Sequence, residues 1–263
     1  MFTSHYQHLK NYSGMILMEL MLAAALGLLI VSAILKIYLV SQQSFRLQTS
    51  INQIQDNAKI AIKILSSEIH LAGYIGCPKL TDDFPLVAIT YPLTVKNKLI
   101  GTPTSITARH ASLNNVALIK SMSNRSMLEV SDQIHFKKNN ILIVSDCKHV
   151  EIFQIKNIIY SHGVERIIPA TPLHYLFKSY AEVARYEVNH FFVSSTKRND
   201  AYGKPIYGLY VKDLQGNTVR LVEGINALNI QYIMNQTLIS AIKIDFEVAS
   251  TPLRKIWHAY VSL

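Results

Sequence analysis

The sequence predicts an α+β fold, in which a long N-terminal helix packs on a C-terminal antiparallel β-sheet domain. No proline precedes Pro78, and Gly27 is the only glycine between Met15 and Ala72, so nothing interrupts a helix over that range. From Pro78 onward the chain changes to short runs rich in valine, isoleucine, tyrosine and phenylalanine, which favour strands. A helical region followed by a series of strands is typical of α+β domains.

The first half of the predicted helix is apolar. Met15 to Leu35 form a run of 21 residues in which Glu19 is the only charge. As a helix this run is about 32 Å long, which matches the hydrocarbon core of a bilayer. A carboxylate in such a segment costs about 2.5–3.5 kcal/mol. A plain anchor would not carry it, so Glu19 predicts a specific task and a positively charged partner.

The second half carries an apolar stripe at helical spacing. Its residues recur every three or four positions, with polar residues between them: Leu47, Ile51, Ile54, Ala58, Ala61, Leu65, Ile69 and Ala72. The stripe covers fewer than four heptads and joins an all-apolar half, which favours packing on a globular domain over a coiled coil. Gly73 supplies the expected end of the helix.

The N-terminal fourteen residues are polar, and the small residue Gly14 stands before the apolar run. A secretory signal places its small-residue cleavage site after the apolar stretch. Cleavage after Gly14 would instead leave a retained anchor at the new N-terminus. The predicted organisation is a leader over 1–14, a transmembrane half-helix over 15–40, an amphipathic half over 41–76 and a β-rich domain over 77–263.

The β-rich half contains several strand-like runs: 86–91, 135–145, 150–160, 185–195, 205–211, 227–234 and 239–250. Asn139-Asn140 and Gln215-Gly216-Asn217 are turn signals, and the second predicts a hairpin. The stretch 92–133 is polar and irregular, and we expect a loop region with one short helix or strand.

The two cysteines, Cys77 and Cys147, favour a disulfide, because an export-type N-terminus directs a chain to an oxidising compartment. Two unrelated buried thiols are the alternative. Asp146-Cys147-Lys148-His149 also brings a thiol and an imidazole together, and on a strand Cys147 and His149 would share a face. Pairing of Cys147 with Cys77 is the favoured interpretation over a Cys–His nucleophile.

The net charge of +9 permits contact with nucleic acid or anionic lipid. Short basic pairs lie near aromatic residues: Lys137-Lys138, Lys197-Arg198 and Arg254-Lys255, with Tyr202, Tyr207 and Trp257. Such residues can bind single-stranded nucleic acid, but scattered pairs are more typical of solvent-facing charge. The other histidines show no metal-ligand spacing, and there is no phosphate-binding loop or nucleophile elbow. The sequence therefore predicts no enzyme, no cofactor and no metal.

Gly14, Met15 and Glu19 resemble the type IV pilin precursor signature: a polar leader, a glycine, a peptidase cut, an apolar helix and a glutamate at the fifth mature position. Four later blocks are similar to the PilW/PulJ-type minor pilins: LSSEIHLAGYIGC (65–77), ILIVSDCKHVEIFQI (141–155), GLYVKDL (208–214) and LVEGINALNIQY (221–232). The chain departs from the family in carrying Met15 where phenylalanine is usual, and in its less basic leader.

This resemblance implies a type IV pilin-like fold, cleavage between Gly14 and Met15 by prepilin peptidase, and N-methylation of Met15. It implies that Glu19 pairs with the amine of a neighbouring subunit, the alternative being that Glu19 snorkels or is protonated. It implies a single-pass inner-membrane protein with a periplasmic domain. The implied partners are other minor pilins, the major pilin and the inner-membrane assembly platform. The implied function is the assembly and priming of a pilus (fimbrium) for twitching motility, adhesion and DNA uptake.

Two other functions stay open. A type II secretion pseudopilin of the J position shares the signature but is usually shorter, and the long β-rich half favours the pilus. A membrane-tethered periplasmic binding or sensor protein would use the helix only as a tether. That alternative predicts that Glu19 is dispensable.

Overall fold

The computed structural model describes residues 12–76, 86–88, 97–200, 202–235, 238–250 and 253–263. The chain divides into two compact units, Met1–Gln53 and Ile54–Leu263. Helix α1 (Tyr12–Leu71) contributes to both. The described strands are β1 (Leu86–Ala88), β2 (Leu99–Thr102), β3 (Ser105–Ala117), β4 (Leu128–Ser131), β5 (Ile141–Ser145), β6 (Val150–Ser161), β7 (Val164–Pro169), β8 (Glu182–Asn199), β9 (Pro205–Lys212), β10 (Thr218–Glu223), β11 (Ile225–Asn235), β12 (Leu238–Ser250) and β13 (Leu253–Ser262). An α+β fold with one long helix and a largely antiparallel sheet domain is therefore confirmed.

The end of α1 lies where the sequence predicts it. The helix stops at Leu71, and Gly73 follows with a φ of +82°. That backbone conformation suits glycine, which has no Cβ to collide with the preceding turn. The N–H of Tyr74 donates to the carbonyl of Leu71 at 2.8 Å, and the N–H of Gly73 donates to Arg109 on β3 at 2.9 Å. The chain leaving the helix is thus tied directly to the sheet.

Most of the predicted apolar stripe forms a core. Six of its residues are buried: Ile54, Ala58, Ala61, Leu65, Ile69 and Ala72. Leu47 and Ile51 are 44% and 37% exposed, so the prediction that they pack on the globular domain is wrong. These two residues lie in the first unit, which ends at Gln53. The packed part of the stripe therefore begins at Ile54.

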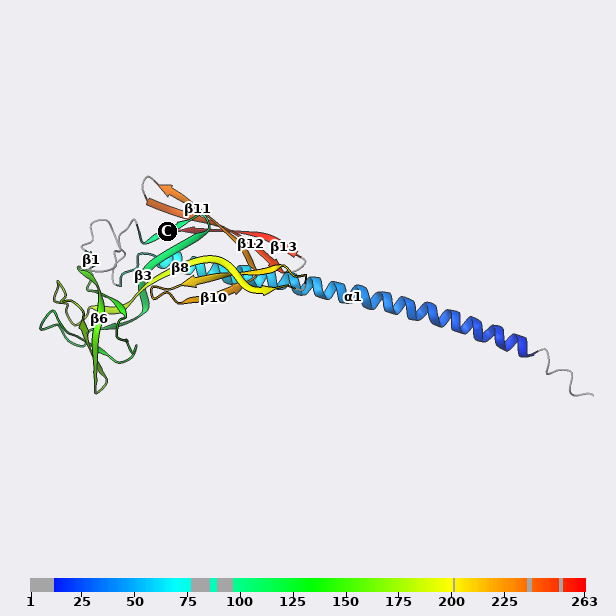
Figure 1. The fold of residues 1–263 in the computed structure, drawn as a ribbon, viewed down its shortest axis with the longest axis horizontal. Helices are drawn as coiled ribbons and strands as arrows, with labels where there is room; N and C mark the ends of the chain where they lie inside the picture. Colours follow the sequence, from blue (N-terminus) through cyan, green and yellow to red (C-terminus); the bar gives the residue numbers. More distant parts are fainter. Residues whose placement is uncertain (1–11, 77–85, 89–96, 201, 236–237, 251–252) are drawn as a thin grey trace, which may run out of the picture. The chain divides into compact units, whose positions relative to one another are not determined.

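In the second unit, the helical segment 54–71 shares one apolar core with two sheets (Figure 1). The larger sheet contributes residues such as Phe191 of β8 and Leu209 of β9. The three-stranded sheet, in the order β11-β12-β13, contributes residues such as Ile244 and Phe246. Ala58 is completely buried, and its small side chain allows the helix backbone to approach the strands closely.

The far part of the larger sheet closes into a small barrel. The path β8-β5-β6-β7-β4 returns to the end of β3 through a bridge between Leu118 and Val130, and β3 pairs with β8. The N–H of Ile119 donates to the carbonyl of Glu129 at 2.9 Å across this junction. Phe136, Phe153 and Phe177 are buried in a second core within this part of the domain.

Strand β5 is buried on both faces, which explains its continuous apolar sequence ILIV. Leu142 and Val144 belong to the barrel core. Ile141 and Ile143 belong to a third cluster, which also contains Ile75. Pairing among the strands is antiparallel except for β1, which runs parallel to β6.

The region 92–133 differs from the loop expected of it. It contains β2, β3 and β4, and β3 alone is 13 residues long. In β3 the buried residues include two alanines, Ala108 and Ala111, and the polar His110, so its apolar signal is weak although the strand lies inside the sheet. The predicted turn at Gln215-Gly216-Asn217 is confirmed as the connection between the antiparallel strands β9 and β10.

Gly224 is the only residue between β10 and β11, and it joins the two sheets. Its φ is +81°, and a Cβ at this position would lie 2.8 Å from the carbonyl oxygen of Ala249. Backbone atoms cannot move aside as a flexible side chain can. We therefore expect Gly224→Ala to lower the free energy of unfolding by about 2–3 kcal/mol, from backbone strain and from this clash.

Gly216→Ala is the matched control for Gly224→Ala. Gly216 has a φ of +90°, but an added Cβ meets only the end of the Lys212 side chain at 4.0 Å. Strain alone should cost about 1 kcal/mol there. Both losses can be measured by urea unfolding of the full chain in detergent micelles, followed by the fluorescence of Trp257. Equal losses in the two variants would contradict the predicted clash with Ala249.

Candidate functional site

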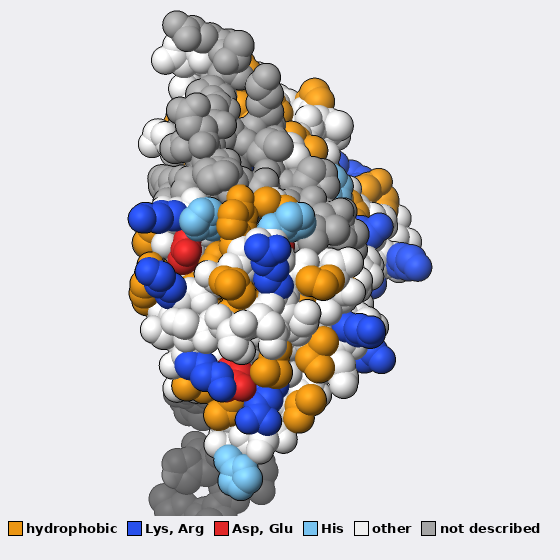
Figure 2. Space-filling view, turned by 90° about the vertical axis from the view of Figure 1, so that its left-hand side faces the viewer, with side chains coloured by type: hydrophobic (Ala, Val, Ile, Leu, Met, Phe, Trp, Pro, Cys, Tyr) orange, Lys and Arg blue, Asp and Glu red, His pale blue; other side chains and the backbone are white. Residues whose placement is uncertain are grey.

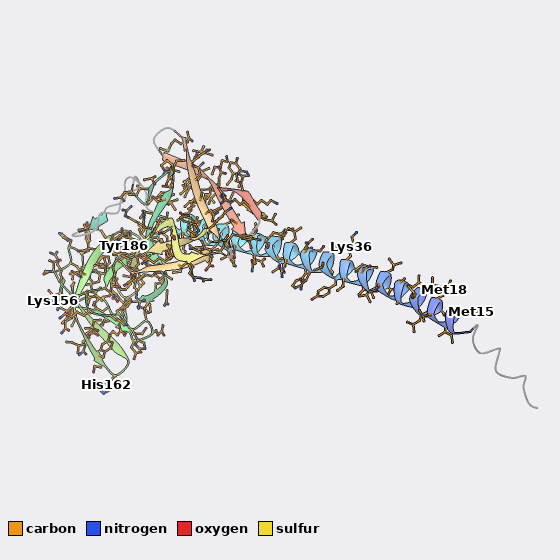
Figure 3. All side chains as sticks on the ribbon, turned by 45° about the vertical axis from the view of Figure 1, so that its right-hand side comes forward. Met15, Met18, Lys36, Lys156, His162 and Tyr186 are labelled. Carbon is orange, nitrogen blue, oxygen red and sulfur yellow. The ribbon has the colours of Figure 1, made fainter. Side chains whose placement is uncertain are left out.

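The described part of the first unit is a helix with an apolar, unburied surface. Every residue from Met15 to Thr49 is exposed, including the whole predicted anchor. Figure 3 shows the side chains of Met15, Met18 and Lys36 extending from this helix. By length and composition it is a helix that can cross a membrane, a test that a signal sequence near an N-terminus also passes. An apolar surface of this length needs lipid or other protein to cover it.

Glu19 lies on this exposed surface. It is the only charge between Met15 and Leu35, and the next charged residue is Lys36. Within the described part of the chain, no hydrogen bond or ion pair involves Glu19. Met15 and Glu19 are four residues apart on one helix, so their side chains lie on the same face, one turn from each other. The carboxylate therefore projects from an apolar face without an intramolecular partner among these residues.

Gly14 and Met15, the residues of the predicted cleavage site, lie inside α1, which begins at Tyr12. The helix therefore starts three residues before the predicted start at Met15. Tyr12, Ser13 and Gly14 include no proline, so nothing in them prevents one further helical turn. Cleavage and methylation at this bond stay predictions.

Cys77, one of the two residues of the predicted disulfide, lies outside the described residues. Cys147 lies between β5 and β6 with a φ of +67°. No cysteine among the described residues is a free thiol. The pairing of Cys77 with Cys147 stays a prediction.

Asp146-Cys147-Lys148-His149 forms a tight turn, not a strand. The carboxylate of Asp146 accepts hydrogen bonds from the backbone N–H of Lys148 at 3.1 Å and of His149 at 2.8 Å. The ring of His149 lies 4.3 Å from the ring of Tyr175. Cys147 and His149 therefore do not lie on one strand, which was the condition for them to share a face. The imidazole is engaged with Asp146 and Tyr175, and this geometry does not form a Cys–His nucleophile.

The buried acids of the barrel hold backbone segments. Glu151 accepts hydrogen bonds from the backbone N–H groups of His174, at 2.7 Å, and Tyr175, at 3.3 Å. Glu165 accepts one from the N–H of Phe136 at 3.2 Å, and burial raises the pKa of this carboxyl. No cluster of three or more metal-ligating side chains occurs among the described residues. Both carboxylates therefore hold backbone segments in place.

One buried polar group joins the helix to the sheet. His110 on β3 is 1% exposed, and its Nε2 lies 3.2 Å from the Oε2 atom of Glu68 on α1. The same carboxylate oxygen accepts a hydrogen bond from Asn189 of β8 at 2.9 Å. The Nδ1 of His110 lies 2.9 Å from the carbonyl oxygen of Ala111. Both ring nitrogens thus face oxygens that can only accept, which favours the doubly protonated imidazolium.

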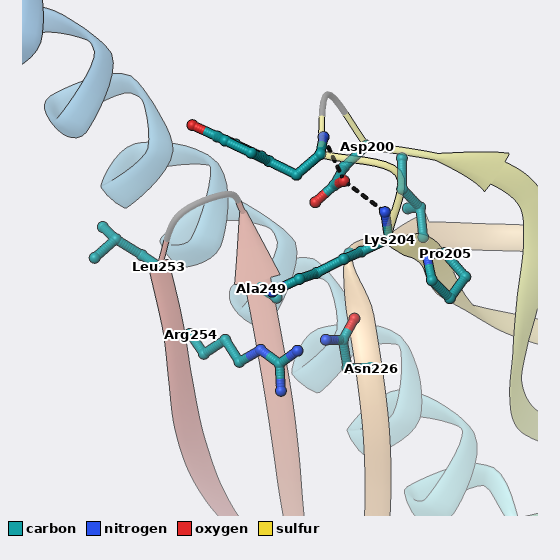
Figure 4. Close-up of a pocket in the computed structure, with 10 residues that line it drawn as sticks. Asp200, Lys204, Pro205, Asn226, Ala249, Leu253 and Arg254 are labelled. Atoms are coloured by element: carbon teal, nitrogen blue, oxygen red, sulfur yellow. Dashed lines mark hydrogen bonds between the residues drawn. The ribbon is translucent and has the colours of Figure 1, made fainter.

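A cavity of about 330 Å³ lies where β8 turns into β9 and β12 into β13 (Figure 4). Lys204 and Arg254 are among its lining residues, and Asp200 is the acid beside them. The carboxylate of Asp200 accepts hydrogen bonds from the backbone N–H of Tyr202 and of Lys204, both at 2.9 Å. That acid therefore holds the turn.

Two of the three predicted basic pairs contain an arginine that forms an ion pair. Arg198 lies 3.3 Å from Glu223, and Arg254 lies 3.2 Å from Glu247. Lys255 lies over the ring of Trp257 at 4.8 Å. On the face in Figure 2, basic side chains lie among hydrophobic and uncharged ones, and some lie beside acidic side chains. Nucleic-acid binding gains no support from this arrangement.

The sequence predicts roles for Gly14, Met15 and Glu19, but it gives no sign of the contact of Glu68 with His110 and Asn189. These residues are 42 and 121 positions from Glu68 along the chain, and no motif connects them. Comparison of the chain with protein-family models, with curated proteins and with solved structures gave no match. Function is therefore inferred from the residues themselves.

Proposed function

We propose that the chain is a minor subunit of a type IV pilus, which helps to prime and assemble the fibre. One observation supports this more than any other. The exposed apolar helical surface from Met15 to Leu35 carries a single charge, Glu19, five residues after Gly14. A membrane anchor explains the apolar surface but not the acid, whereas a polymer subunit explains both.

The role of Glu19 follows from the cost of burying a charge. A carboxylate in an apolar environment is stabilised only when a positive group and hydrogen-bond donors reach it. Cleavage after Gly14 frees the α-amine of Met15, which the peptidase then methylates in a separate step. The same amine on a neighbouring subunit is available at this depth. Pairing between subunits neutralises both groups and fixes the axial register of one helix against the next.

The apolar segment then has two environments during the life of the protein. Before assembly, residues 15–40 lie in the inner membrane and the β-rich domain lies in the periplasm. During assembly, the same surface packs on the helices of other minor pilins and of the major pilin. The packed segment from Ile54 to Ala72 holds the β-rich domain on the helix in both states.

Gly14→Ala tests this proposal at its first step. A Cβ at the residue before the scissile bond should block prepilin peptidase, so the variant should accumulate with its fourteen-residue leader. The wild-type chain should begin at N-methylated Met15. Mass spectrometry of the protein extracted from the inner membrane distinguishes the two.

Gly27→Ala is the matched control for Gly14→Ala. Gly27 lies in the same helix, and a Cβ there meets nothing within 4 Å. Alanine also favours the helix over glycine, so Gly27→Ala should be processed normally. A wild-type protein that keeps its leader, or that is cut after the apolar segment, would overturn the proposal.

A further inference from the structure

The larger sheet has a gap along one edge of β8. On one side, β8 pairs with β3 throughout the segment 186–189. On the other side, β5 pairs with β8 only as far as Arg185, opposite Leu142, and β9 begins to pair at His190, opposite Lys212. Among the described residues, no strand pairs with 186–189 on that second side.

A cavity of about 450 Å³ occupies this gap. It is lined by residues 185–189 of β8, by the turn that precedes β5 and by the turn that follows β9. Along an antiparallel strand, successive residues direct their backbone N–H and C=O groups to alternate sides. Half of the residues in 186–189 therefore present unpaired backbone groups to the cavity, which we call the notch.

The hydroxyl of Tyr186 is a further group without a partner. Tyr186 lines the notch and is 4% exposed, and its oxygen has no hydrogen-bond partner in the described structure. Burial raises the pKa of this phenol to about 12, so the hydroxyl keeps its proton at neutral pH. Buried hydroxyls without a partner are uncommon, because each loses its hydration without compensation.

The strands around the notch determine the direction in which a bound peptide, here called the guest, would run. Both β5 and β9 run antiparallel to β8, so an extended peptide in the gap would run antiparallel to β8 as well. Its C-terminal end would then point toward Ile141, where β5 begins. At that end a continuing chain would meet β5, and at the other end the guest leaves the sheet, because β9 pairs with β8 from His190 onward. A chain that ends beside Ile141 needs only one such turn.

The charges in the notch match a chain terminus. Lys137 and Arg185 both lie at the end where β5 begins, and among the described residues neither forms an ion pair. At the opposite end, the carboxylate of Asp213 accepts hydrogen bonds from Gln215 and Asn217 and so holds its turn. Glu187 is the remaining acid in the notch, and its charge acts on buried His110.

We propose that the notch binds the C-terminal end of a partner polypeptide, in extended form, as an added strand beside β8. The backbone of 186–189 hydrogen-bonds to the guest, and Lys137 and Arg185 bind its terminal carboxylate. Val188 and Leu214, which pack on the cluster around Tyr186, offer an apolar surface to a guest side chain. This role does not depend on polymerisation through the N-terminal helix.

The test uses the full chain in detergent micelles and two pools of acetylated pentapeptides with random sequences. One pool has free C-terminal carboxylates and the other, otherwise identical, has C-terminal amides. Immobilised protein retains peptides, which are quantified by mass spectrometry. We expect the wild-type chain to retain the free-carboxylate pool about ten-fold more than the amide pool.

Variants of the notch locate the binding. The double variant Lys137→Ala, Arg185→Ala should lose the preference for the free carboxylate. The matched double variant Lys138→Ala, Lys197→Ala removes the same charge outside the notch and should keep it. The larger side chain of Leu214→Trp should fill the notch, so this variant should retain neither peptide pool. Its circular dichroism spectrum should be unchanged.

Three outcomes would overturn the proposal. The first is that the wild-type chain retains neither pool. The second is that it retains both pools equally, because the carboxylate would then contribute nothing. The third is that the preference persists in the Lys137→Ala, Arg185→Ala variant, because binding would then occur elsewhere.

Discussion

Replacing Glu19 by valine is expected to remove the protein from the assembled fibre while leaving it in the inner membrane. Insertion should improve, because the variant no longer places a carboxylate in hydrocarbon, a change worth about 2.5–3.5 kcal/mol. Assembly should fail, because the amine of the neighbouring subunit then meets an apolar side chain. Breaking a buried charge pair costs about 3–5 kcal/mol, which corresponds to a loss of more than a hundred-fold in subunit association.

Two further substitutions at Glu19 separate charge from shape. Glu19→Gln keeps the size and a hydrogen-bond acceptor but loses the charge, so it should also assemble poorly. Glu19→Asp keeps the charge on a shorter side chain and should restore part of the incorporation. The measurement is the ratio of protein in sheared surface fibres to protein in the membrane fraction, by immunoblot.

Ser32→Ala is the control for Glu19→Val, because Ser32 lies in the same exposed stretch and its hydroxyl only bonds the carbonyl of Leu29 in its own helix. It should assemble normally. If Glu19→Val also reaches the fibre at the wild-type ratio, the helix is a tether and the protein belongs to the binding or sensor class. The Glu19 series therefore separates these two classes of function.

The helix was predictable from the sequence because its evidence is local. The lack of proline and the three- and four-residue spacing fix its length, and Gly73 fixes its end. What the spacing could not show is where burial begins. Leu47 and Ile51 continue the same pattern as Ile54, yet both are exposed, and the stripe joins the buried core only from Ile54 onward.

The strands between 99 and 131 were missed for a related reason. In β3, burial depends on the neighbours β2 and β8, and the buried residues include Ala108, a small side chain, and His110, a polar one. A pattern search recognises large apolar side chains at alternate positions, and β3 offers few of them. That β3 is a strand follows from its pairing with β2 and β8 and not from its own side-chain pattern.

Of the two candidate sites, one is visible in the local sequence and the other depends on how the strands pair. Gly14, Met15 and Glu19 lie within six residues of each other, so their relation is visible in the sequence. The notch exists because β5 pairs with β8 only up to Arg185 and β9 pairs with it only from His190 onward. It is lined by residues from three distant segments of the chain. Nothing in the local sequence of Tyr186 or Arg185 indicates that one edge of their strand is open.

The contact between His110 and Glu68 should make the stability of the β-rich domain depend on pH. Burial is the largest single influence on His110 and lowers its pKa, but hydrogen bonds to Glu68 and Ala111 and the charges of Glu68 and Glu187 outweigh it, so the pKa is raised. Burial likewise raises the pKa of Glu68, but the hydrogen bonds from His110 and Asn189 and the charge of His110 outweigh it, so the pKa is lowered.

The signs of these two shifts define a window of pH. A raised histidine pKa gives stability that is fully present below the unfolded value of 6.5 and is lost as pH rises through the folded value. A lowered glutamate pKa gives stability that is present above the unfolded value of 4.5 and is lost as pH falls through the folded value. The contribution of the pair should therefore be largest between about pH 4.5 and 6.5 and smaller on either side.

His110→Ala should lower the free energy of unfolding by about 3 kcal/mol at pH 6, because it leaves Glu68 facing an apolar space without its main partner. This is the lower end of the range for buried pairs, since the side chain of Glu68 is 21% exposed. A double-mutant cycle of His110→Ala with Glu68→Gln should give a coupling energy that is larger at pH 6 than at pH 8.5. The measurement is urea unfolding of the full chain in detergent micelles at both values.

The pair formed by His258 and Asp245 is the matched control for this cycle. Its Nδ1–Oδ1 distance is 2.6 Å, shorter than that of the buried pair, but the side chain of His258 is 56% exposed. Solvent screens an exposed pair, so His258→Ala should cost less than about 1 kcal/mol at either pH. If the two histidine variants lose the same stability, burial does not strengthen the contact between α1 and β3. If the coupling energy of His110 with Glu68 is the same at pH 6 and pH 8.5, the predicted dependence of the pair on the ionisation of His110 is contradicted.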